Sequence, residues 1–297
     1  MNKQGTAVLL ASARVPFLLL TLVLVLLGVA CASTVTQEME WEKLAIILLT
    51  AVSAHVSVNA LNEYFDFRIG LDAVTDKTPF SGGSGALPHN PQQARSVLLL
   101  GIVSLLVTLA AGLYLVTVTG QELLLPGMAG LLIVALYTPW MTRSPFLSLV
   151  MPGAGFGLIM VIGTAYVLAG QVTLTMVLAS LAPFFLVNNL LLLNQFPDME
   201  PDVTVGRNHL LIAKGKRVGL WTYAIFLACA YLAVVVGCVT GLLPWVGLIA
   251  LATIASTAVI LAARLLAPSF VDSLPQLRYL AIPLGVIAID AGLMAFG

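Results

Sequence analysis

Acidic and asparagine side chains gather at two places in the chain, each at the end of a long apolar run: Asn62, Glu63, Asp66 and Asp72 at the first, and Asn194, Asp198 and Asp202 at the second. In both places an asparagine precedes an aspartate by four residues, which puts the two side chains on one helical face, one turn apart. Carboxylates crowded at the end of an apolar helix repel one another and are costly to desolvate, so a cation is needed to offset them. Magnesium fits best, because it takes carboxylate oxygens and substrate phosphates while keeping several waters.

Basic side chains are interleaved with these acids: Arg68, Lys77, Arg207 and Lys214. Arginine can hold phosphate oxygens through a bidentate fork, and lysine acts as a point charge, so the group favours a polyanion such as a diphosphate. A glycine-rich stretch, residues 81–85, could present backbone amides to an anion, but a flexible linker explains it equally well. The alternative is that the acids are solvated charges flanking helices and the bases are membrane anchors. Two clusters with the same asparagine offset favour one shared site.

The elements that position these residues are membrane helices. The chain has 297 residues, 60% of them hydrophobic and 9% charged, with a mean hydropathy of +1.05, and this is more apolar surface than a soluble core could bury. A span needs roughly 20 mostly apolar residues. We expect one all-α domain over residues 1–297, a bundle of nine transmembrane helices at about 13–34, 43–62, 96–117, 122–140, 146–169, 173–196, 217–239, 244–264 and 276–296.

The basic residues predict how this bundle is oriented. With nine spans and a cytoplasmic N-terminus, twelve of the thirteen lysines and arginines lie on the cytoplasmic side, and only Lys43 lies outside. That asymmetry is what the positive-inside rule demands. The two cytoplasmic connections from Glu63 to Gln93 and from Pro197 to Lys216 hold seven of the thirteen acids. We therefore expect an integral protein of the cell membrane whose N-terminus and active-site loops face the cytoplasm.

These motifs resemble those of the UbiA superfamily of membrane prenyltransferases. The resemblance rests on Asn62-Glu63 with Asp66 and Asp72, on Asn194 with Asp198 and Asp202, and on nine helices with both motifs on one face, and it covers essentially the whole chain. The position of Asp72, ten residues after Asn62, looks more like the branch that prenylates a naphthoate in the menaquinone pathway than the 4-hydroxybenzoate branch.

The resemblance implies a set of roles. Asp66, Asp72, Asp198 and Asp202 would hold one or two magnesium ions on the diphosphate, with Asp66 and Asp198 essential for catalysis. Asn62 and Asn194 would complete or orient that shell at the diphosphate. Glu63 stands where the family usually has aspartate, and its longer carboxylate would bind metal through water. The family's Tyr-x-x-x-Lys motif here begins at Tyr137 but has Met141 in place of lysine, so the nearest base, Arg143, would bind the diphosphate instead.

The expected reaction is ionisation of an allylic polyprenyl diphosphate and capture of the allyl cation by an electron-rich acceptor carbon, with magnesium, arginine and lysine neutralising the departing diphosphate. The acceptor would be a small aromatic quinone precursor. A non-aromatic lipid acceptor such as a glycerol phosphate ether keeps the same chemistry and stays open. In a different class, a cation- or proton-coupled transporter would place its ionisable groups nearer the membrane midplane. The membrane lipid is an expected partner and nucleic acid is not; the oligomeric state is open.

Five further polar residues lie in or beside the expected helices. His55 shares a helical face with Asn62 and Asp66, and we interpret it as a satisfied intramembrane histidine. Asn188 and Asn189 lie deep in an apolar run, where interhelical hydrogen bonding is the favoured interpretation. His209 is interpreted as an ordinary loop residue, and Asp290 as structural.

Overall fold

The computed structural model describes residues 3–75 and 83–245, and within these ranges every regular element is a helix. The helices are α1 (Lys3–Ala13), α2 (Leu18–Ser33), α3 (Trp41–Arg68), α4 (Ala86–His89), α5 (Ala94–Thr119), α6 (Leu124–Leu136), α7 (Pro145–Gly153), α8 (Val161–Ala169), α9 (Leu174–Thr204), α10 (Leu210–Lys214) and α11 (Lys216–Val239). A π-helical stretch, Ala154–Met160, joins α7 to α8. The all-α class is confirmed.

Six helical stretches of the described residues are long and apolar enough to cross a membrane: Lys3–Ser33, Trp41–Arg68, Pro91–Thr119, Pro145–Ala169, Leu174–Thr204 and Lys216–Val239. A shorter apolar stretch, Gln121–Leu136, occupies the position of a further expected span. The last two expected spans, 244–264 and 276–296, fall almost wholly outside the described residues. The part of the chain that the structure covers therefore supports a polytopic membrane bundle, and the count of nine stays a prediction.

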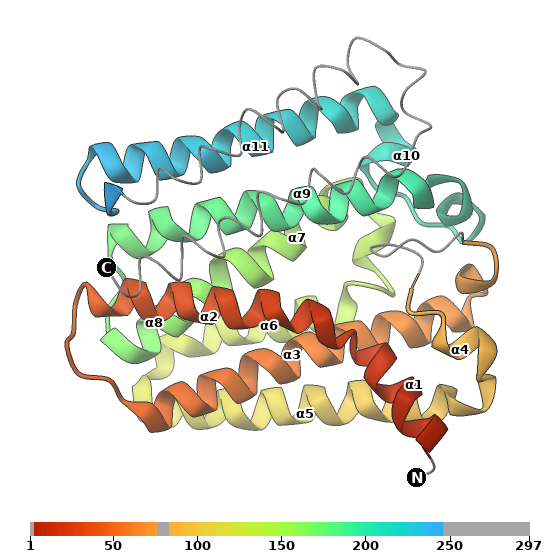
Figure 1. The fold of residues 1–297 in the computed structure, drawn as a ribbon, viewed down its shortest axis with the longest axis horizontal. Coiled ribbons are helices and arrows are strands. Elements are labelled where there is room, and N and C mark those ends of the chain that lie inside the picture. Colours follow the sequence, from red (N-terminus) through yellow and green to blue (C-terminus); the bar gives the residue numbers. More distant parts are fainter. Residues whose placement is uncertain (1–2, 76–82, 246–297) are drawn as a thin grey trace.

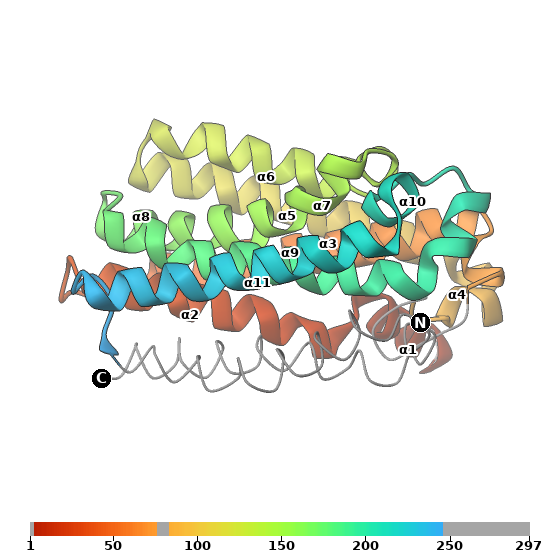
Figure 2. The same cartoon turned by 90° about the horizontal axis from the view of Figure 1, so that it is seen from above.

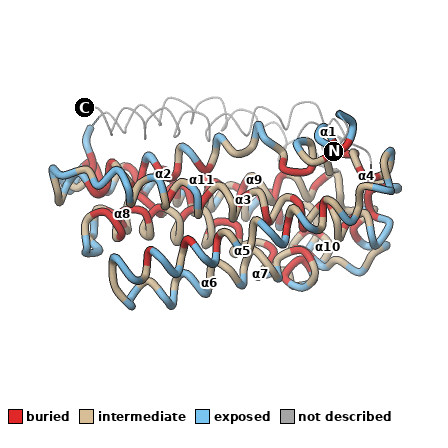
Figure 3. The backbone as a smooth tube through the Cα atoms, turned by 90° about the horizontal axis from the view of Figure 1, so that it is seen from below, coloured by how far each residue is buried: buried red, intermediate tan, exposed pale blue. Residues whose placement is uncertain are grey.

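The long helices lie side by side along one direction, so the bundle has two distinct ends (Figures 1 and 2). The N-terminus, α1, α4 and α10 lie at one end, and the turn from α2 to α3 lies at the other. Many large apolar side chains on α5, α6 and α11 face outward, and exposed positions recur along the outer helices in Figure 3. A bundle with apolar side chains on its outside is suited to lipid rather than to water.

The first helix differs from its expected extent, 13–34. It begins earlier, at Lys3, and is interrupted at Arg14, which adopts a left-handed conformation with φ of 51°. A single 3₁₀ turn, Val15–Phe17, follows before α2 begins. Pro16 lies within this turn, and since proline lacks an N–H and restricts the residue before it, an unbroken helix is disfavoured there. The interruption matters for the site, because Arg14 lines the cavity described below.

The end of α9 also differs from expectation. The sequence placed the helix end near residue 196, with a loop from Pro197 onward, but α9 continues to Thr204 with Pro197 and Pro201 inside it. Each proline removes one helical N–H, and such losses are tolerated in membrane helices where other groups satisfy the freed carbonyls. As a result Asp198 and Asp202 lie on the last two turns of a helix, which fixes their spacing more firmly than a loop would.

Two asparagines of α9 join it to its neighbours. Asn188 Oδ1 accepts a hydrogen bond from the Gly153 N–H at the end of α7, at 2.6 Å, and Asn189 Nδ2 donates to the Tyr223 carbonyl on α11, at 3.0 Å. The prediction of interhelical hydrogen bonding is confirmed for both residues. Polar side chains in an apolar bundle are costly without such partners.

Close packing of the π-helical stretch on α9 gives a testable prediction. A Cβ added at Gly157 would lie 2.3 Å from the Phe184 backbone nitrogen, whereas one added at Gly163 meets nothing within 4 Å. Gly157→Ala is expected to destabilise the bundle by about 1–3 kcal/mol, because overpacking forces the two backbones apart. Thermal unfolding in detergent measures this, with Gly163→Ala as the matched control that should unfold at or slightly above the wild-type temperature, because alanine is favoured over glycine inside a helix. Equal unfolding temperatures for the two variants would show that the helices are not in contact there.

Candidate active site

A cavity of about 420 Å³ runs between α3, α5, α6, the α7–α8 stretch and α9. Most of its lining is apolar, but at the end of the bundle that carries α1, α4 and α10 the lining becomes strongly polar. The charged and amide side chains at that end include Arg14, Asn62, Asp66, Asp72, Asn194, Gln195, Asp198, Asp202 and Arg207. The two acidic clusters found in the sequence therefore meet in one site.

The C-terminal ends of α3 and α9 supply most of the acids. Asp66 lies on the last turn of α3, and Asp198 and Asp202 lie on the last turns of α9. Helix C-termini carry partial negative charge from their unsatisfied carbonyls, which adds to the charge of the carboxylates. The site consequently carries concentrated negative charge, which favours the binding of cations.

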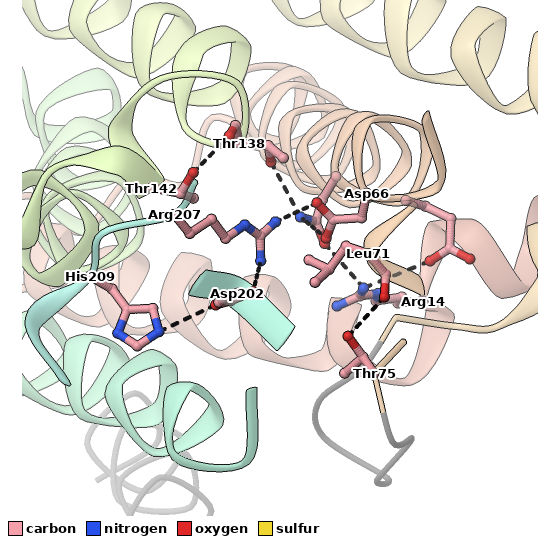
Figure 4. A network of polar contacts seen from close by, with 11 residues as sticks. Arg14, Asp66, Leu71, Thr75, Thr138, Thr142, Asp202, Arg207 and His209 are labelled. Atoms are coloured by element: carbon pink, nitrogen blue, oxygen red, sulfur yellow. Dashed lines mark hydrogen bonds and ion pairs between the residues drawn. The ribbon is translucent and has the colours of Figure 1, made fainter. Parts of the chain in front are cut away.

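Arg207 neutralises part of this negative charge. Its guanidinium donates to Asp66 Oδ1 through one nitrogen and to Asp202 Oδ1 through another, the latter at 3.0 Å, so it joins α3 to α9 across the cavity (Figure 4). Gly206, at φ of 77°, turns the chain back after α9, and the Asn208 N–H then donates to the Thr142 carbonyl at 3.1 Å. Burial lowers the pKa of the Arg207 guanidinium, but the two aspartates raise it by more, and the net pKa lies above the ordinary value.

Asn62 links three further parts of the site. Its amide donates to Asp66 Oδ2 at 3.0 Å and to Thr138 Oγ1 at 3.3 Å, and its carbonyl oxygen accepts from Arg14 at 3.1 Å. The four-residue spacing of Asn62 and Asp66 thus does bring the two side chains together on α3. Asn62 holds the Asp66 carboxylate in a fixed orientation toward the cavity.

Glu63 and Asp72 lie on either side of Gly83. Glu63 is fully buried, does not line the cavity, and accepts hydrogen bonds from the backbone and hydroxyl of Ser84, with Arg14 at 3.7 Å. Asp72 does line the cavity, and a Cβ added at Gly83 would lie 2.7 Å from its Oδ1. The structure therefore places Glu63 where it holds the loop after the first acidic cluster, so its role as a metal ligand remains a prediction.

The predicted basic residues separate into two groups. Arg68, Arg143 and Lys214 are exposed and do not line the cavity, and Lys77 lies outside the described residues. Arg207 does line the cavity, and so does Arg14, which was not among the basic residues predicted to bind the diphosphate. A possible signal was its position two residues before Pro16, where a helix break can direct a side chain inward.

His209 was interpreted from the sequence as an ordinary loop residue, and this was wrong. Its side chain is buried and lines the cavity, and its Nε2 lies 3.3 Å from Asp202 Oδ2 (Figure 4). His209 therefore belongs to the site, and its proximity to Gly206 and Arg207 in the sequence was the available signal.

His55 and Tyr137 also line the cavity. His55 Nδ1 lies 2.7 Å from Thr21 Oγ1, as expected of a satisfied intramembrane histidine, and its ring packs edge-on against Phe156. The Tyr137 hydroxyl donates to the Ser148 carbonyl at 3.2 Å. Both side chains could touch a substrate beside the polar end.

The acids suit a magnesium ion that is shared with a phosphate ligand. Among the described residues, no three acidic, histidine or cysteine side chains converge closely enough to enclose a metal by themselves. Magnesium needs only one or two carboxylates when substrate phosphates and waters complete its shell. The Arg207 guanidinium already shows that a positive group fits between Asp66 and Asp202. The residues present therefore fit magnesium held by Asp66, Asp72, Asp198 and Asp202 together with a diphosphate.

Fold and site together define a helical membrane protein with an apolar cavity. One end of this cavity carries acids that can bind cations and arginines that can bind phosphate. The model of the UbiA prenyltransferase family matches residues 21–276. The chain belongs to this family.

One sequence relative and two solved structures extend this finding. The chain is 28% identical over 203 residues to 1,4-dihydroxy-2-naphthoate octaprenyltransferase from Bacillus subtilis (strain 168), a match that covers 67% of this chain and 64% of that protein, less than two thirds of its length. Two structures of a UbiA homolog from Archaeoglobus fulgidus, bound to DMAPP and Mg²⁺ or to GPP and Mg²⁺, each share the fold with a TM-score of 0.69. Identity is 15% and 14%, with 97% and 98% of this chain covered and 98% and 100% of the other chain.

A further solved structure, from work on a digeranylgeranylglyceryl phosphate synthase, also has a TM-score of 0.69, at 18% identity and 98% coverage of both chains. At these identities the solved structures establish a shared fold.

Proposed function

We propose that the protein transfers a polyprenyl group from an allylic diphosphate to a small aromatic quinone precursor of the dihydroxynaphthoate type, in a magnesium-dependent reaction. The observation that carries the proposal is the meeting of four aspartates and two arginines at one end of a single apolar cavity. A prenyl diphosphate matches this cavity, because it has a charged head and an apolar tail. Family membership and the naphthoate relative support this choice of reaction and acceptor.

The side chains of the site divide the work of the reaction. Arg14 and Arg207 bind phosphate oxygens, Asn62 orients Asp66, and the apolar walls hold the tail and exclude water. When bound, magnesium supplies positive charge to the diphosphate oxygens. As the allylic carbon–oxygen bond breaks, the electron pair leaves with the diphosphate, where the arginines lower the cost of the developing charge. An acceptor ring carbon then bonds to the allylic carbon and the ring loses its proton.

Arg207 has a second function in this scheme. Without a diphosphate its guanidinium neutralises Asp66 and Asp202, two carboxylates that would otherwise face each other across a buried site. With magnesium and a diphosphate bound, Asp66 and Asp202 would have a second cationic partner, and the Arg207 guanidinium would be able to bind phosphate oxygens. A single arginine thus stabilises both the free and the loaded site.

The experiment that tests the acceptor uses purified protein with magnesium, labelled geranylgeranyl diphosphate and three acceptors: 1,4-dihydroxy-2-naphthoate, 4-hydroxybenzoate and geranylgeranylglyceryl phosphate. A prenylated naphthoate identified by mass is the expected product. Product only with the glycerol phosphate would instead support the function suggested by the digeranylgeranylglyceryl phosphate synthase structure. No product with any of the three would overturn the proposed acceptor classes.

We further propose that the polar end of the cavity faces the cytoplasm, as the distribution of basic residues predicts. Asn208 is exposed at that end and Glu38 is exposed in the turn from α2 to α3 at the other. In intact cells, an impermeant thiol reagent is expected to label Glu38→Cys but to spare Asn208→Cys until the membrane is opened, in a background without Cys31, Cys229 and Cys238. The opposite labelling pattern would invert the proposed orientation.

A further inference from the structure

Glu63 belongs to the first acidic cluster, but its side chain does not line the cavity. It follows Asn62 directly on α3 and is fully buried. Neighbouring positions of a helix point about 100° apart, since one turn takes about 3.6 residues, so Asn62 faces the cavity while Glu63 faces the chain packed beside it. A carboxylate away from water is costly unless its oxygens find hydrogen-bond donors. The donors around Glu63 therefore indicate its role.

Both carboxylate oxygens of Glu63 accept hydrogen bonds from Ser84. Oε2 accepts from the Ser84 backbone N–H at 2.8 Å, and Oε1 accepts from the Ser84 hydroxyl at 2.5 Å. The nearest positive charge is Arg14, whose Nη2 lies 3.7 Å from Oε2, farther than a hydrogen bond. A metal-bound water would have to compete with the Ser84 bonds in a place that the cavity does not reach.

Ser84 lies at the start of α4, and its position matters for that helix. Its hydroxyl oxygen accepts from the Ala86 N–H, the first of α4, at 3.1 Å. A helix of four residues is not stable by itself, so it depends on contacts such as this one and on Leu87, which is fully buried against α3 and α5. Glu63 thus fixes the point where the chain enters α4.

The residue before Ser84 forms part of the cavity wall. Gly83 lines the cavity and has φ of 69°, a left-handed conformation that favours glycine. A Cβ added at Gly83 would lie 2.7 Å from Asp72 Oδ1 and 3.4 Å from Glu63 Oε2. The main chain at Gly83 therefore lies between the buried carboxylate of Glu63 and the cavity-lining carboxylate of Asp72. A group that holds Ser84 in place also holds this wall against Asp72.

We propose that Glu63 is a positioning residue, which holds the main chain at Gly83 against Asp72 through its two hydrogen bonds with Ser84. This inference rests on the proposed prenyl transfer and adds a residue that the reaction needs although it touches neither the donor nor magnesium. Glu63 acts through the length of its side chain and its hydrogen bonds to Ser84. A metal ligand would act through its negative charge, and substitutions can separate these properties.

Glu63→Asp keeps the charge and shortens the side chain. The carboxylate withdraws by about 1.5 Å, one carbon–carbon bond, so the 2.8 Å contact with the Ser84 N–H exceeds the limit of roughly 3.2 Å for a hydrogen bond. We expect kcat to fall by at least about tenfold. In the protein without substrates, hydrogen–deuterium exchange of the Ser84 amide should become at least about threefold faster.

Glu63→Gln makes the opposite change. Its amide oxygen can accept from the Ser84 N–H and its amide nitrogen can donate to the Ser84 hydroxyl oxygen, so both contacts survive without the charge. This variant should retain at least about a third of the wild-type kcat and exchange the Ser84 amide at the wild-type rate. The missing charge beside Arg14 accounts for the remaining loss.

Two further variants complete the test. Ser84→Ala removes the hydroxyl from the other partner and keeps the backbone bond, so kcat should fall by about threefold and exchange of the amide at position 84 should become faster. Glu200→Asp is the matched control, because it makes the same shortening at an exposed residue of α9 that does not line the cavity. It should change neither kcat nor the exchange rate.

A magnesium ligand would give the reverse order of activities, because magnesium needs the negative charge that aspartate keeps and glutamine lacks. A tenfold or larger loss in Glu63→Gln with normal activity in Glu63→Asp would therefore overturn the inference. Wild-type exchange at position 84 in both Glu63→Asp and Ser84→Ala would overturn it as well. If the wild type transfers no prenyl group, the proposed function fails, whereas the exchange rates still decide whether Glu63 holds Ser84.

Discussion

Asp198→Asn is expected to lower the kcat of prenyl transfer by about 1,000-fold, because it removes one carboxylate from the groups that hold the metal and the diphosphate. The substitution keeps the size of the side chain on α9, so the bundle should fold normally. Transfer of labelled prenyl group at saturating magnesium measures the effect.

Glu200→Gln is the matched control for this prediction. Glu200 lies between Asp198 and Asp202 on the same helix, but it is exposed and does not line the cavity. Its neutralisation should change kcat by less than about twofold, since an exposed charge outside the site is screened by solvent. Equal losses in the two variants would mean that net charge near the membrane surface matters and that Asp198 has no special role.

Arg207→Ala is expected to lower kcat/KM for the prenyl diphosphate by about 100- to 1,000-fold. Removing one partner of a buried ion pair costs about 3–5 kcal/mol, and Arg207 is paired with two carboxylates at once. Arg207→Lys should restore little of the loss, because a lysine ammonium is a point charge and lacks the planar fork that reaches both aspartates. Initial rates over a range of donor concentrations separate kcat from KM.

Arg143→Ala is the matched control for Arg207→Ala, because both arginines were predicted to bind the diphosphate. Arg143 is exposed and lies outside the cavity lining, so its loss should raise the donor KM by less than about threefold, as for other exposed charges. A larger effect for Arg143→Ala than for Arg207→Ala would show that the diphosphate binds at the outer surface of the bundle. Circular dichroism of each variant confirms that the helices are intact.

The parts of the fold and site that follow from local spacing could be predicted from the sequence. Apolar runs of sufficient length predict the spans, and the Asn62–Asp66 spacing predicts the hydrogen bond that the structure contains. The repetition of the motif before Asp198 correctly indicates that the two clusters meet. The spans and this hydrogen bond follow from hydropathy and helical periodicity, which are properties of the sequence.

Other parts depend on how the chain turns between helices. Arg14 itself has a left-handed backbone conformation just before Val15 and Pro16, and this directs its side chain into the site. The turn at Gly206 places Arg207 and His209 in the site. Arg68 and Arg143 have the same charge and similar positions in the sequence, but they point outward. Backbone turns of one or two residues decide which basic side chains face the cavity, and charge or hydropathy patterns carry no information about them.

The extension of α9 through two prolines could not be predicted for a related reason. Proline at 197 and 201 indicates the end of a helix when only local propensity is considered. Packing and the membrane environment override that preference here, so Asp202 remains on the helix and can meet Arg207. Tertiary context, which acts between segments far apart in the sequence, decides this element.

The central claim is that the acid-lined end of the cavity transfers a prenyl group from a magnesium-bound diphosphate. The most direct measurement is simultaneous quantification of released diphosphate and prenylated acceptor from purified protein, with magnesium or with excess EDTA. The account predicts one diphosphate released for each prenylated acceptor with magnesium, and neither product with EDTA. Prenylated acceptor formed at an undiminished rate in EDTA, or diphosphate released with no prenylated acceptor whichever acceptor is supplied, would contradict it.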